Sequence, residues 1–484
     1  MMDLCLYAMN EAERQKVEYA DIRIINSKEQ KLVSENERVY EVKDNIDQGF
    51  GVRVLKNGAW GFASSPIIAK DEIAKVVRNA VAVAKASASV NSKIKDKKIS
   101  VLKNPKVIDS FKTIVRVDPF SIPIKDKFDF MFEISRRMLK VDKIKKVYSV
   151  ANFENVDKHF ANIFGSQIHT NVTTTMFEYV AYAVDESTSK DRSYGIYPQT
   201  IGYEAILESD LLDRCERVAS EAVMKLTAHR GVEGIKDLVL DPTHLALTIH
   251  ESVGHATELD RALGMEESLS GRTFATVDKL NKMQYGSPIV NLVADLTLEN
   301  GLATHGYDDD GTKGKRWHIV KDGIFSGYST SIDTAPEISM SESNGRCNAD
   351  SWFSIPIVRI PNLGLMPGKD NLSVDDLIAG VDDGIYIEGM GSFSIDQMRE
   401  NFQFGGDVFW EIKHGKITRM LDNVTYQAIT RDFWNSCDAI AGEKYWVKSG
   451  VANCGKGDPM QTAKMTHGAA PARFRNIKIG GGNV

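Results

Sequence analysis

The segment His250–His255 contains the residues whose types and spacing are best suited to catalysis. It reads His-Glu-Ser-Val-Gly-His within an otherwise apolar stretch of the chain. Neutral imidazole is a common zinc ligand, and a neighbouring glutamate can take a proton from a metal-bound water. His250 and His255 are therefore candidate metal ligands, and Glu251 is a candidate general base.

The spacing of the two histidines places a demand on the helix that carries them. They lie one position further apart than the histidines of the His-Glu-x-x-His motif of zinc proteases. On a regular helix, residues i and i+4 differ in direction by about 40°, whereas residues i and i+5 differ by about 140°. We expect the helix to widen by one residue, as a π-bulge does, or to unwind near Gly254. Without such a distortion, His250 and His255 would be ordinary core or surface histidines.

Cys454 is the candidate for a third metal ligand. It lies in the segment Asn453–Pro459, whose glycines and proline predict a tight loop in which the backbone approaches a ligand closely. The nearby cation of Lys456 is expected to favour the thiolate. Two imidazoles and one thiolate leave the fourth zinc position open for water, as in a catalytic site.

The cysteine pattern argues against a disulfide framework. The chain has five widely spaced cysteines, and none of them forms a Cys-x-x-Cys pair. We expect Cys5 and Cys215, which lie in helical patterns, to be small buried residues of the core.

These motifs resemble those of the TldD/PmbA family of metallopeptidases, specifically its metal-bearing, TldD-like branch. The resemblance rests mainly on His250–His255 together with the distant Cys-Gly-Lys-Gly segment at Cys454–Gly457. Weaker support comes from shorter segments along the chain, namely Ala20–Arg23, Gly49–Arg53, Trp60–Ser65, Tyr307–Thr312, Arg359–Asn362, Gly384–Ile387 and Ile479–Gly482.

The resemblance implies both a site and a reaction. It implies that His250, His255 and Cys454 hold Zn²⁺ and that Glu251 is the general base. The implied substrates are unstructured peptides, such as leader segments of modified peptides. The implied assembly is a homodimer or a heterodimer with a related PmbA/TldE-like subunit that lacks the metal motif.

The chain also departs from the family pattern. The family usually carries a glycine near position 401, where this chain has Asn401, and Cys347 is unfamiliar in its context. These differences concern substrate preference more than the metal.

Composition and charge favour a multidomain enzyme over a nucleic-acid-binding or membrane protein. At 484 residues the chain exceeds the size that one hydrophobic core usually organises. Its 60 lysines and arginines and 66 aspartates and glutamates give a net charge of −6, which provides no electrostatic reason for binding nucleic acid. No apolar stretch approaches the roughly 20 residues that span a bilayer, and the amino end has no signal-peptide pattern. We therefore expect a cytoplasmic location.

The patterns predict a mixed α+β fold with two regions. Residues 1–230 combine helices and strands and include a linker at about 89–112. Residues 231–484 form a predominantly antiparallel β domain that carries the motif helix and contains all the proposed ligands. Periodicity predicts helices at 3–17, 71–87, 125–140 and 206–227, and strands at 20–26, 31–42, 145–154, 159–169 and 173–184. Hairpins are expected around Asn57-Gly58 and around Lys413–Lys416.

Other carboxylates rank lower as functional residues. Asp308–Asp310 precedes a glycine and superficially resembles a calcium loop, but no distal glutamate follows in register, so a turn between strands is favoured. Glu258 or Asp260, about one turn after His255, could accept the proton of a ligand imidazole.

Three histidines outside the motif have no firm role. His244 could contact the metal ligands, although a place in the first turn of the helix is favoured. His467 could contact the substrate or the cysteine segment, although a plain loop position is favoured. His305, beside the acidic turn, is unassigned.

Two alternatives to a zinc peptidase stay open. Cys454 could be the nucleophile of a cysteine hydrolase, with one of the histidines as its base. The chain could also be a non-catalytic partner, although the intact Glu251 and both histidines count against that function.

Overall fold

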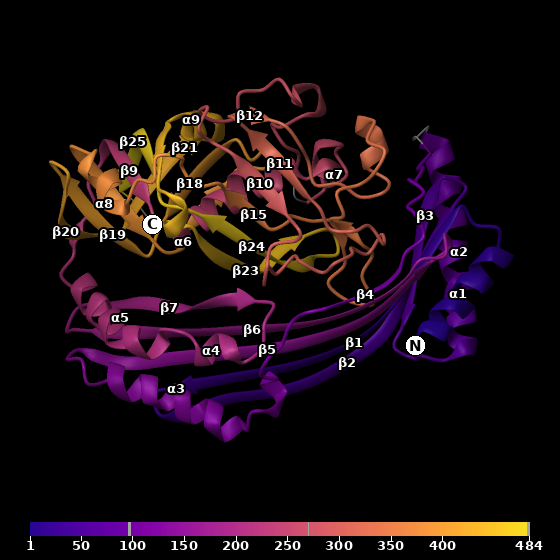
Figure 1. Ribbon diagram of the computed structural model, residues 1–484, viewed down its shortest axis with the longest axis horizontal. Coiled ribbons are helices and arrows are strands. Elements are labelled where there is room, and N and C mark those ends of the chain that lie inside the picture. The colour runs from indigo at the N-terminus through magenta and orange to yellow at the C-terminus, as the bar shows by residue number, and fades with distance from the viewer. Residues whose placement is uncertain (95–97, 270, 482–484) are drawn as a thin grey trace.

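The chain folds into two lobes of mixed helix and sheet, which confirms the predicted α+β class. The computed structural model describes residues 1–94, 98–269 and 271–481. The N-terminal lobe (residues 1–227) contains one long, curved sheet, and the C-terminal lobe (residues 228–481) rests against one face of it (Figure 1). The C-terminal lobe supplies every residue of the predicted metal site.

The N-terminal sheet has the strand order β3-β2-β1-β5-β6-β4, and β7 also pairs with β6. The hairpins β1–β2 and β5–β6 are very long, and they give the sheet its length in Figure 1. Its strands are β1 (Tyr19–Glu35), β2 (Arg38–Lys56), β3 (Ala59–Ser65), β4 (Ile108–Lys112), β5 (Ile144–Asn162), β6 (Gln167–Val184) and β7 (Ser189–Gln199).

The turns of this sheet explain where the predicted strands hold and where they fail. The Asn57-Gly58 hairpin between β2 and β3 is confirmed, with φ values of 56° and 73°. The strand predicted at 31–42 is wrong because Asn36, at φ 54°, turns the chain inside it. The three strands predicted between 145 and 184 are also wrong. The polar residues 155–158 remain hydrogen-bonded within the sheet, so the two long strands β5 and β6 take the place of the three predicted strands.

Helices cover the two ends of the sheet's outer face. Helices α1 (Met2–Arg14) and α2 (Lys70–Ile94) pack at one end, and α3 (Ile124–Met138) and α5 (Leu211–Lys225) pack at the other. The short α4 (Glu204–Leu207) and the 3₁₀ turn η1 (Pro119–Ser121) complete this lobe. The predicted linker at 89–112 is wrong in two places, because α2 runs on to residue 94 and β4 occupies 108–112; residues 95–97 lie outside the described residues.

The C-terminal lobe is built on two larger sheets and one two-stranded pair. The first sheet has the order β12-β11-β10-β15-β24-β23, and the second β17-β18-β21-β25-β9-β16-β19-β20-β8, with β22 added to β25. The strands of the first sheet are β10 (Leu292–Asp295), β11 (Arg316–Lys321), β12 (Ile324–Phe325), β15 (Leu363–Leu365), β23 (Val447–Lys456) and β24 (Gln461–Ala469). The strands of the second sheet and of the pair β13–β14 are β8 (His229–Arg230), β9 (Gly234–Leu240), β13 (Cys347–Asn348), β14 (Ile357–Val358), β16 (Asp383–Glu388), β17 (Phe393–Ile395), β18 (Asn401–Gly405), β19 (Val408–Lys413), β20 (Lys416–Asp422), β21 (Val424–Ile429), β22 (Cys437–Ile440) and β25 (Ala472–Gly481).

The motif helix α6 (Pro242–Ile249) lies within the apolar core that these sheets share. The hairpin predicted at Lys413–Lys416 is confirmed, with His414 and Gly415 at positive φ. The shorter helical segments of this lobe are η2 (His250–Gly254), η3 (His255–Thr257), α7 (Leu259–Ala262), η4 (Val277–Lys279), η5 (Ala335–Ile338), α8 (Val374–Ala379), α9 (Thr430–Asn435) and η6 (Glu443–Tyr445). Among the residues that the structure describes, no helix is both long and apolar enough to cross a membrane.

Buried ion pairs join the lobes at the acidic turn Asp308–Asp310. Asp310 lies 2.7 Å from Arg53 of β2, and Asp309 lies against both Arg23 of β1 and Lys158 of β5. The turn also closes a bridge between Tyr307 and Lys313, as a turn between strands would. Its carboxylates are therefore used in docking the two lobes.

Candidate metal centre

The sequence determines where the motif helix begins and how it is distorted. Asp241 caps α6 by accepting a 2.8 Å hydrogen bond from the Thr243 N–H, and Pro242 occupies the first turn. The helix then continues as the π-helical turn η2, in which the His255 N–H bonds the His250 carbonyl. This i→i+5 bond places both histidines on one face. The predicted one-residue widening is confirmed.

Gly254 permits this geometry through its missing side chain. A Cβ at this position would lie 2.9 Å from two carbons of Ile360, closer than ordinary van der Waals contact. The π-turn is therefore packed directly against a core residue, and a larger residue at 254 would push the two apart.

Cys454 is brought to the two histidines by a strand rather than a loop. The predicted tight loop is wrong at this position, because Cys454 belongs to β23 and pairs in register with Ala463 of β24. A register break between Val451 and Cys454 precedes it. Gly455 also belongs to β23, and of the two glycines only Gly457, at φ 86°, lies in the turn just beyond.

The three predicted ligands meet in the core of the C-terminal lobe. One ligand atom from each of His250, His255 and Cys454 lies within 4.8 Å of the other two. Cys454 Sγ is 3.4 Å from His255 Nε2. All three side chains are buried, with exposed fractions of 4–5%. A buried N, N, S donor set on two separate backbone segments, the distorted helix and β23, is the chemistry that zinc prefers.

Hydrogen bonds on the far side of each ring fix which nitrogen faces the centre. His467 Nδ1 must donate to the Leu363 carbonyl at 3.1 Å, because a carbonyl oxygen only accepts. Burial first, and then the charge of His250, hold the pKa of His467 well below its usual value, so its Nε2 accepts from His250 Nδ1 at 2.8 Å. The Nε2 atom of His250 is then free of hydrogen and available to a metal.

His255 is oriented in the same way by a carboxylate. Its Nδ1 lies 2.9 Å from Glu258 Oε2. Burial raises the pKa of Glu258, but the charges of Lys456 and His255 outweigh burial and keep the pKa well below the ordinary value. The ionised carboxylate can accept a hydrogen bond from Nδ1, and the other ring nitrogen, Nε2, lies on the side of Cys454. Glu258 is thus the one of the two predicted carboxylates that contacts a ligand imidazole.

The expected roles of His467 and Lys456 need correction. The sequence favoured a plain loop for His467, yet it lies on β24 and is fully buried against His250. Lys456 was expected to act on the thiolate, but its ammonium contacts Asp260 at 2.7 Å and Glu258 at 3.1 Å. Burial raises the pKa of Cys454, and the charge and hydrogen bond of His255 outweigh it, so the pKa is lowered overall.

Glu251 lies beside the ligands and is held by a cation that sequence reasoning missed. Arg399 Nη1 donates to Glu251 Oε2 at 2.8 Å. Arg399 sits just before β18 at a positive φ of 62°, an unusual backbone conformation for this residue type. It lies two residues before Asn401, the position at which the resemblance led us to expect a glycine.

The two remaining histidines lie away from the predicted ligands. His244 is in the first turn of α6, as favoured, and hydrogen-bonds Tyr426 Oη and the Gly389 carbonyl at 2.9 Å each. Burial lowers its pKa to about 4. His305 lines a cavity between the lobes.

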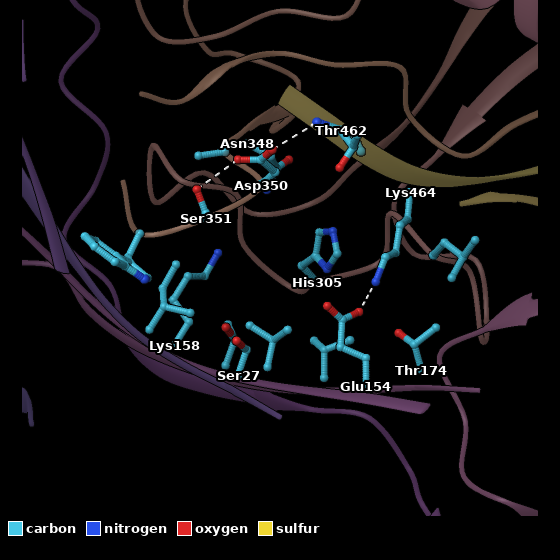
Figure 2. A pocket seen from close by; sticks show the side chains of 18 of the residues that line it. Ser27, Glu154, Lys158, Thr174, His305, Asn348, Asp350, Ser351, Thr462 and Lys464 are labelled. Carbon is cyan, nitrogen blue, oxygen red and sulfur yellow. Dashed lines mark hydrogen bonds and ion pairs between the residues drawn. The ribbon is translucent and has the colours of Figure 1, made fainter. Parts of the chain in front are cut away.

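That cavity of about 240 Å³ separates the N-terminal sheet from the strand next to Cys454 (Figure 2). In Figure 2, Ser27, Glu154, Lys158 and Thr174 project from the sheet, and His305 and Lys464 face them from the C-terminal lobe. Glu154 and Lys464 form an ion pair across the space. Ala463, the register partner of Cys454, is also in the lining, so the cavity reaches the strand that pairs with β23.

Comparison with known proteins identifies the family. A model described as the PmbA/TldA metallopeptidase C-terminal domain matches residues 233–481, and one described as PmbA/TldA metallopeptidase domain 1 matches residues 20–84. The chain belongs to the TldD/PmbA family. The matched C-terminal range contains the π-turn and the cysteine strand together.

Relatives in this family share most of the chain at low identity. A metalloprotease of Methanocaldococcus jannaschii is 27% identical, over 91% of this chain and 92% of that protein. A protein of Saccharolobus solfataricus described as a zinc metalloprotease TldD homologue is 20% identical, over 98% and 99%. The crystal structure of a Thermotoga maritima protein, described as a candidate modulator of a DNA gyrase, has a TM-score of 0.79 at 16% identity and covers 99% of both chains. That structural likeness establishes the fold.

Proposed function

We propose that this protein is a zinc-dependent peptidase that hydrolyses unstructured peptides. The observation that carries the proposal is the convergence of two imidazoles and one thiol, with Glu251 beside them. The relatives named metalloproteases support the same class of reaction. Zinc held by His250, His255 and Cys454 would supply a Lewis acid to the peptide carbonyl and to water.

The chain's own residues account for the proton transfers. Glu251 takes the proton of the attacking water and later passes it to the leaving amine. The ion pair with Arg399 holds the carboxylate in one position until substrate arrives. Glu258 and His467 keep the ligand imidazoles in the tautomers that bind a cation.

Burial of the centre supports a preference for unfolded substrates. The residues His250 and Glu251 are only 5% and 6% exposed, so a folded protein surface could not present a peptide bond to them. We propose that an extended segment enters through the cavity beside β24 and pairs with exposed strand edges. Such pairing reads the backbone more than the side chains and suits broad specificity.

The Glu251→Gln variant tests the proposal. The amide keeps the shape of the side chain but cannot accept a proton, so hydrolysis of an unstructured reporter peptide should fall at least about 100-fold. Zinc content, measured by elemental analysis, should stay at the wild-type value, because Glu251 is not one of the ligands. Full activity in this variant would exclude the assigned role.

Chelation separates the zinc peptidase from a cysteine hydrolase. The 3.4 Å contact between Cys454 and His255 is also the contact that a nucleophilic thiol would need. A metallopeptidase should lose activity on chelation and regain it with zinc, whereas a cysteine hydrolase should be indifferent to both treatments. A thiol reagent does not distinguish the two.

We also propose that the working protein is a homodimer or pairs with a related PmbA/TldE-like subunit. Activity of the chain alone should be measured together with its mass in solution. An active monomer would contradict this proposal and leave the chemistry of the centre unaffected.

A further inference from the structure

A second cluster of metal-binding side chains lies on the N-terminal sheet, outside the proposed active centre. Asp157, His159 and His169 each offer a ligand atom within 4.8 Å of the other two. They belong to the paired strands β5 and β6 and take no part in the proposed peptidase reaction.

The register of the sheet brings the three side chains together. His159 of β5 is directly opposite His169 of β6, and Asp157 precedes His159 by two residues on the same face. The intervening Lys158 and its partner Thr170 line the cavity between the lobes. Alternation therefore points the cluster to the outer face of the sheet, between the areas covered by helices α1–α2 and α3–α5.

The distances within the cluster suit a shared cation. His169 Nε2 is 2.7 Å from Asp157 Oδ2, and His159 Nε2 is 3.2 Å from Asp157 Oδ1. The imidazole rings stack with centroids 4.4 Å apart and an interplanar angle of 6°. Zinc–ligand bonds of about 2.0–2.2 Å in a tetrahedron separate the donor atoms by roughly 3.3 Å, which small side-chain rotations reach here.

Neighbouring amides hold the carboxylate in place. Asn171 Nδ2 donates to Asp157 Oδ2 at 3.0 Å, and Asn155 Nδ2 donates to the Asn171 side-chain oxygen at 3.0 Å. The three ligands project from two hydrogen-bonded strands, so little further ordering is needed on binding. Side-chain exposures of 29% for Asp157, 19% for His159 and 42% for His169 leave a path for an ion and its remaining water.

The charges at the cluster favour a bound metal ion over protonation of both histidines. Two stacked imidazolium ions would repel each other across one carboxylate. Burial first, and then the charge of His169, lower the pKa of His159. Burial raises the pKa of Asp157, but its hydrogen bonds and both histidines outweigh burial and lower it, so the carboxylate is ionised.

We propose that Asp157, His159 and His169 form a second metal site, which binds a divalent transition-metal ion such as Zn²⁺ and clamps β5 to β6. One carboxylate and two imidazoles are ligands suited to zinc, cobalt or iron rather than calcium or magnesium. The site shares no ligand with the His250, His255 and Cys454 centre, so it does not depend on the proposed peptidase function.

Cobalt substitution distinguishes the two sites in one sample. Full-length protein without a histidine tag is stripped with a chelator and titrated with Co²⁺ and, separately, Zn²⁺. We expect two equivalents to bind. Cobalt at the Cys454 centre should give a thiolate-to-metal charge-transfer absorption, whereas cobalt at the outer site, which has no sulfur ligand, should give only the weaker ligand-field bands.

Single substitutions show which of the two sites binds each equivalent of metal. His169→Ala and Asp157→Asn should each bind one equivalent and keep the charge-transfer absorption. Cys454→Ala should lose that absorption and keep the outer equivalent. His414→Ala is the matched control, because His414 is an exposed histidine paired with Asp382 that belongs to no candidate metal-binding group among the described residues, and the variant should still bind two equivalents.

The metal stoichiometry of His169→Ala can also overturn the proposal. If the wild type binds one equivalent and His169→Ala binds the same amount, the outer site does not exist. Circular dichroism and thermal melting should show that His169→Ala is folded. The melting temperature supplies a second readout, because the zinc-dependent rise should be smaller in His169→Ala than in the His414→Ala control.

Discussion

His467, a residue that the sequence could not place, decides which nitrogen of His250 is available to a metal. The chain of hydrogen bonds runs from the Leu363 carbonyl through His467 to His250. Both ends of this chain are buried, so the tautomer of His250 does not depend on solvent. This indirect control predicts a measurable effect on metal affinity.

We predict that His467→Ala weakens zinc binding by about 10–100-fold, as loss of a partner behind a metal-ligating histidine typically does. The substituted chain keeps all three ligands, so its site should still fill at high zinc concentration. Competition with a chelator of known affinity measures the change. His467→Gln, which can still accept a hydrogen bond from His250, should recover part of the loss. Unchanged affinity in His467→Ala would show that the pairing is only packing.

The ligand residues themselves were within reach of sequence reasoning, but the residues behind them were not. His250, Glu251 and His255 lie in one short motif, and the glycines around Cys454 made that cysteine conspicuous. Glu258 was foreseen because it lies one turn from His255. Arg399 and His467 are far from the motif in sequence, and only the packing of β18 and β24 brings them to it.

At the scale of the element, a single extra residue in one helical turn makes the motif usable. The sequence predicted this distortion because an unbroken helix would point the two imidazoles apart. The structure places it at η2, between the regular helix α6 and the 3₁₀ turn η3. Two of the predicted ligands therefore depend on the local packing around Gly254.

We predict that Gly254→Ala destabilises the fold by about 1–3 kcal/mol, because the new methyl group would overlap Ile360. The backbone itself, at φ −54°, accepts alanine without strain. Calorimetry and zinc stoichiometry should show a lower melting temperature and a weakened site. Adding Ile360→Val removes one of the two crowded carbons and should restore part of the stability. An unaltered melting temperature would mean that the π-turn tolerates a side chain.

The points at which strands begin and end were the least predictable features of the fold. The turn at Asn36 lies inside a strand predicted at 31–42, although asparagine accepts the positive φ that the turn requires. At residues 155–158, pairing with β1 and β6 outweighs the preference of a few polar residues. The Asn57-Gly58 hairpin was predictable because its turn requires positive φ from the residues themselves.

At the scale of the whole molecule, buried charges join the lobes across the long sheet. Arg53 lies 2.6 Å from Asp21 of its own lobe and 2.7 Å from Asp310 of the other. Glycines on the same sheet allow close docking: a Cβ at Gly49 would overlap the Trp352 ring, 2.3 Å from its nearest atom. No local sequence pattern could have paired these residues.

Removing the Arg53 guanidinium should therefore destabilise the fold. We expect Arg53→Met to lower the free energy of unfolding by about 3–5 kcal/mol, because two buried carboxylates lose their cation. Urea unfolding measures the change. Arg38→Met on the same strand is the matched control. It replaces an exposed arginine and should change stability by less than about 0.5 kcal/mol. Equal effects of the two substitutions would contradict the docking role.

Asp309 should make the joined lobes sensitive to acid. Burial raises its pKa, but the charges of Lys158 and Arg23 outweigh burial, so the folded-state pKa lies below the unfolded value of about 3.9. Its stabilising contribution is therefore present above that value and disappears as the pH falls through the folded-state pKa. The stability difference between wild type and Asp309→Asn should shrink as urea midpoints are followed from neutral pH to acid. A difference that is constant with pH would exclude this linkage.

The distance along the chain between the proposed metal ligands has a consequence for biosynthesis. His255 and Cys454 are separated by 199 residues, so a growing polypeptide exposes both imidazoles long before the ribosome adds the thiol. A nascent chain can hold an ion only weakly at that stage. The hydrolysis proposed above needs all three donors, so it could not start until the β23–β24 hairpin had left the exit tunnel.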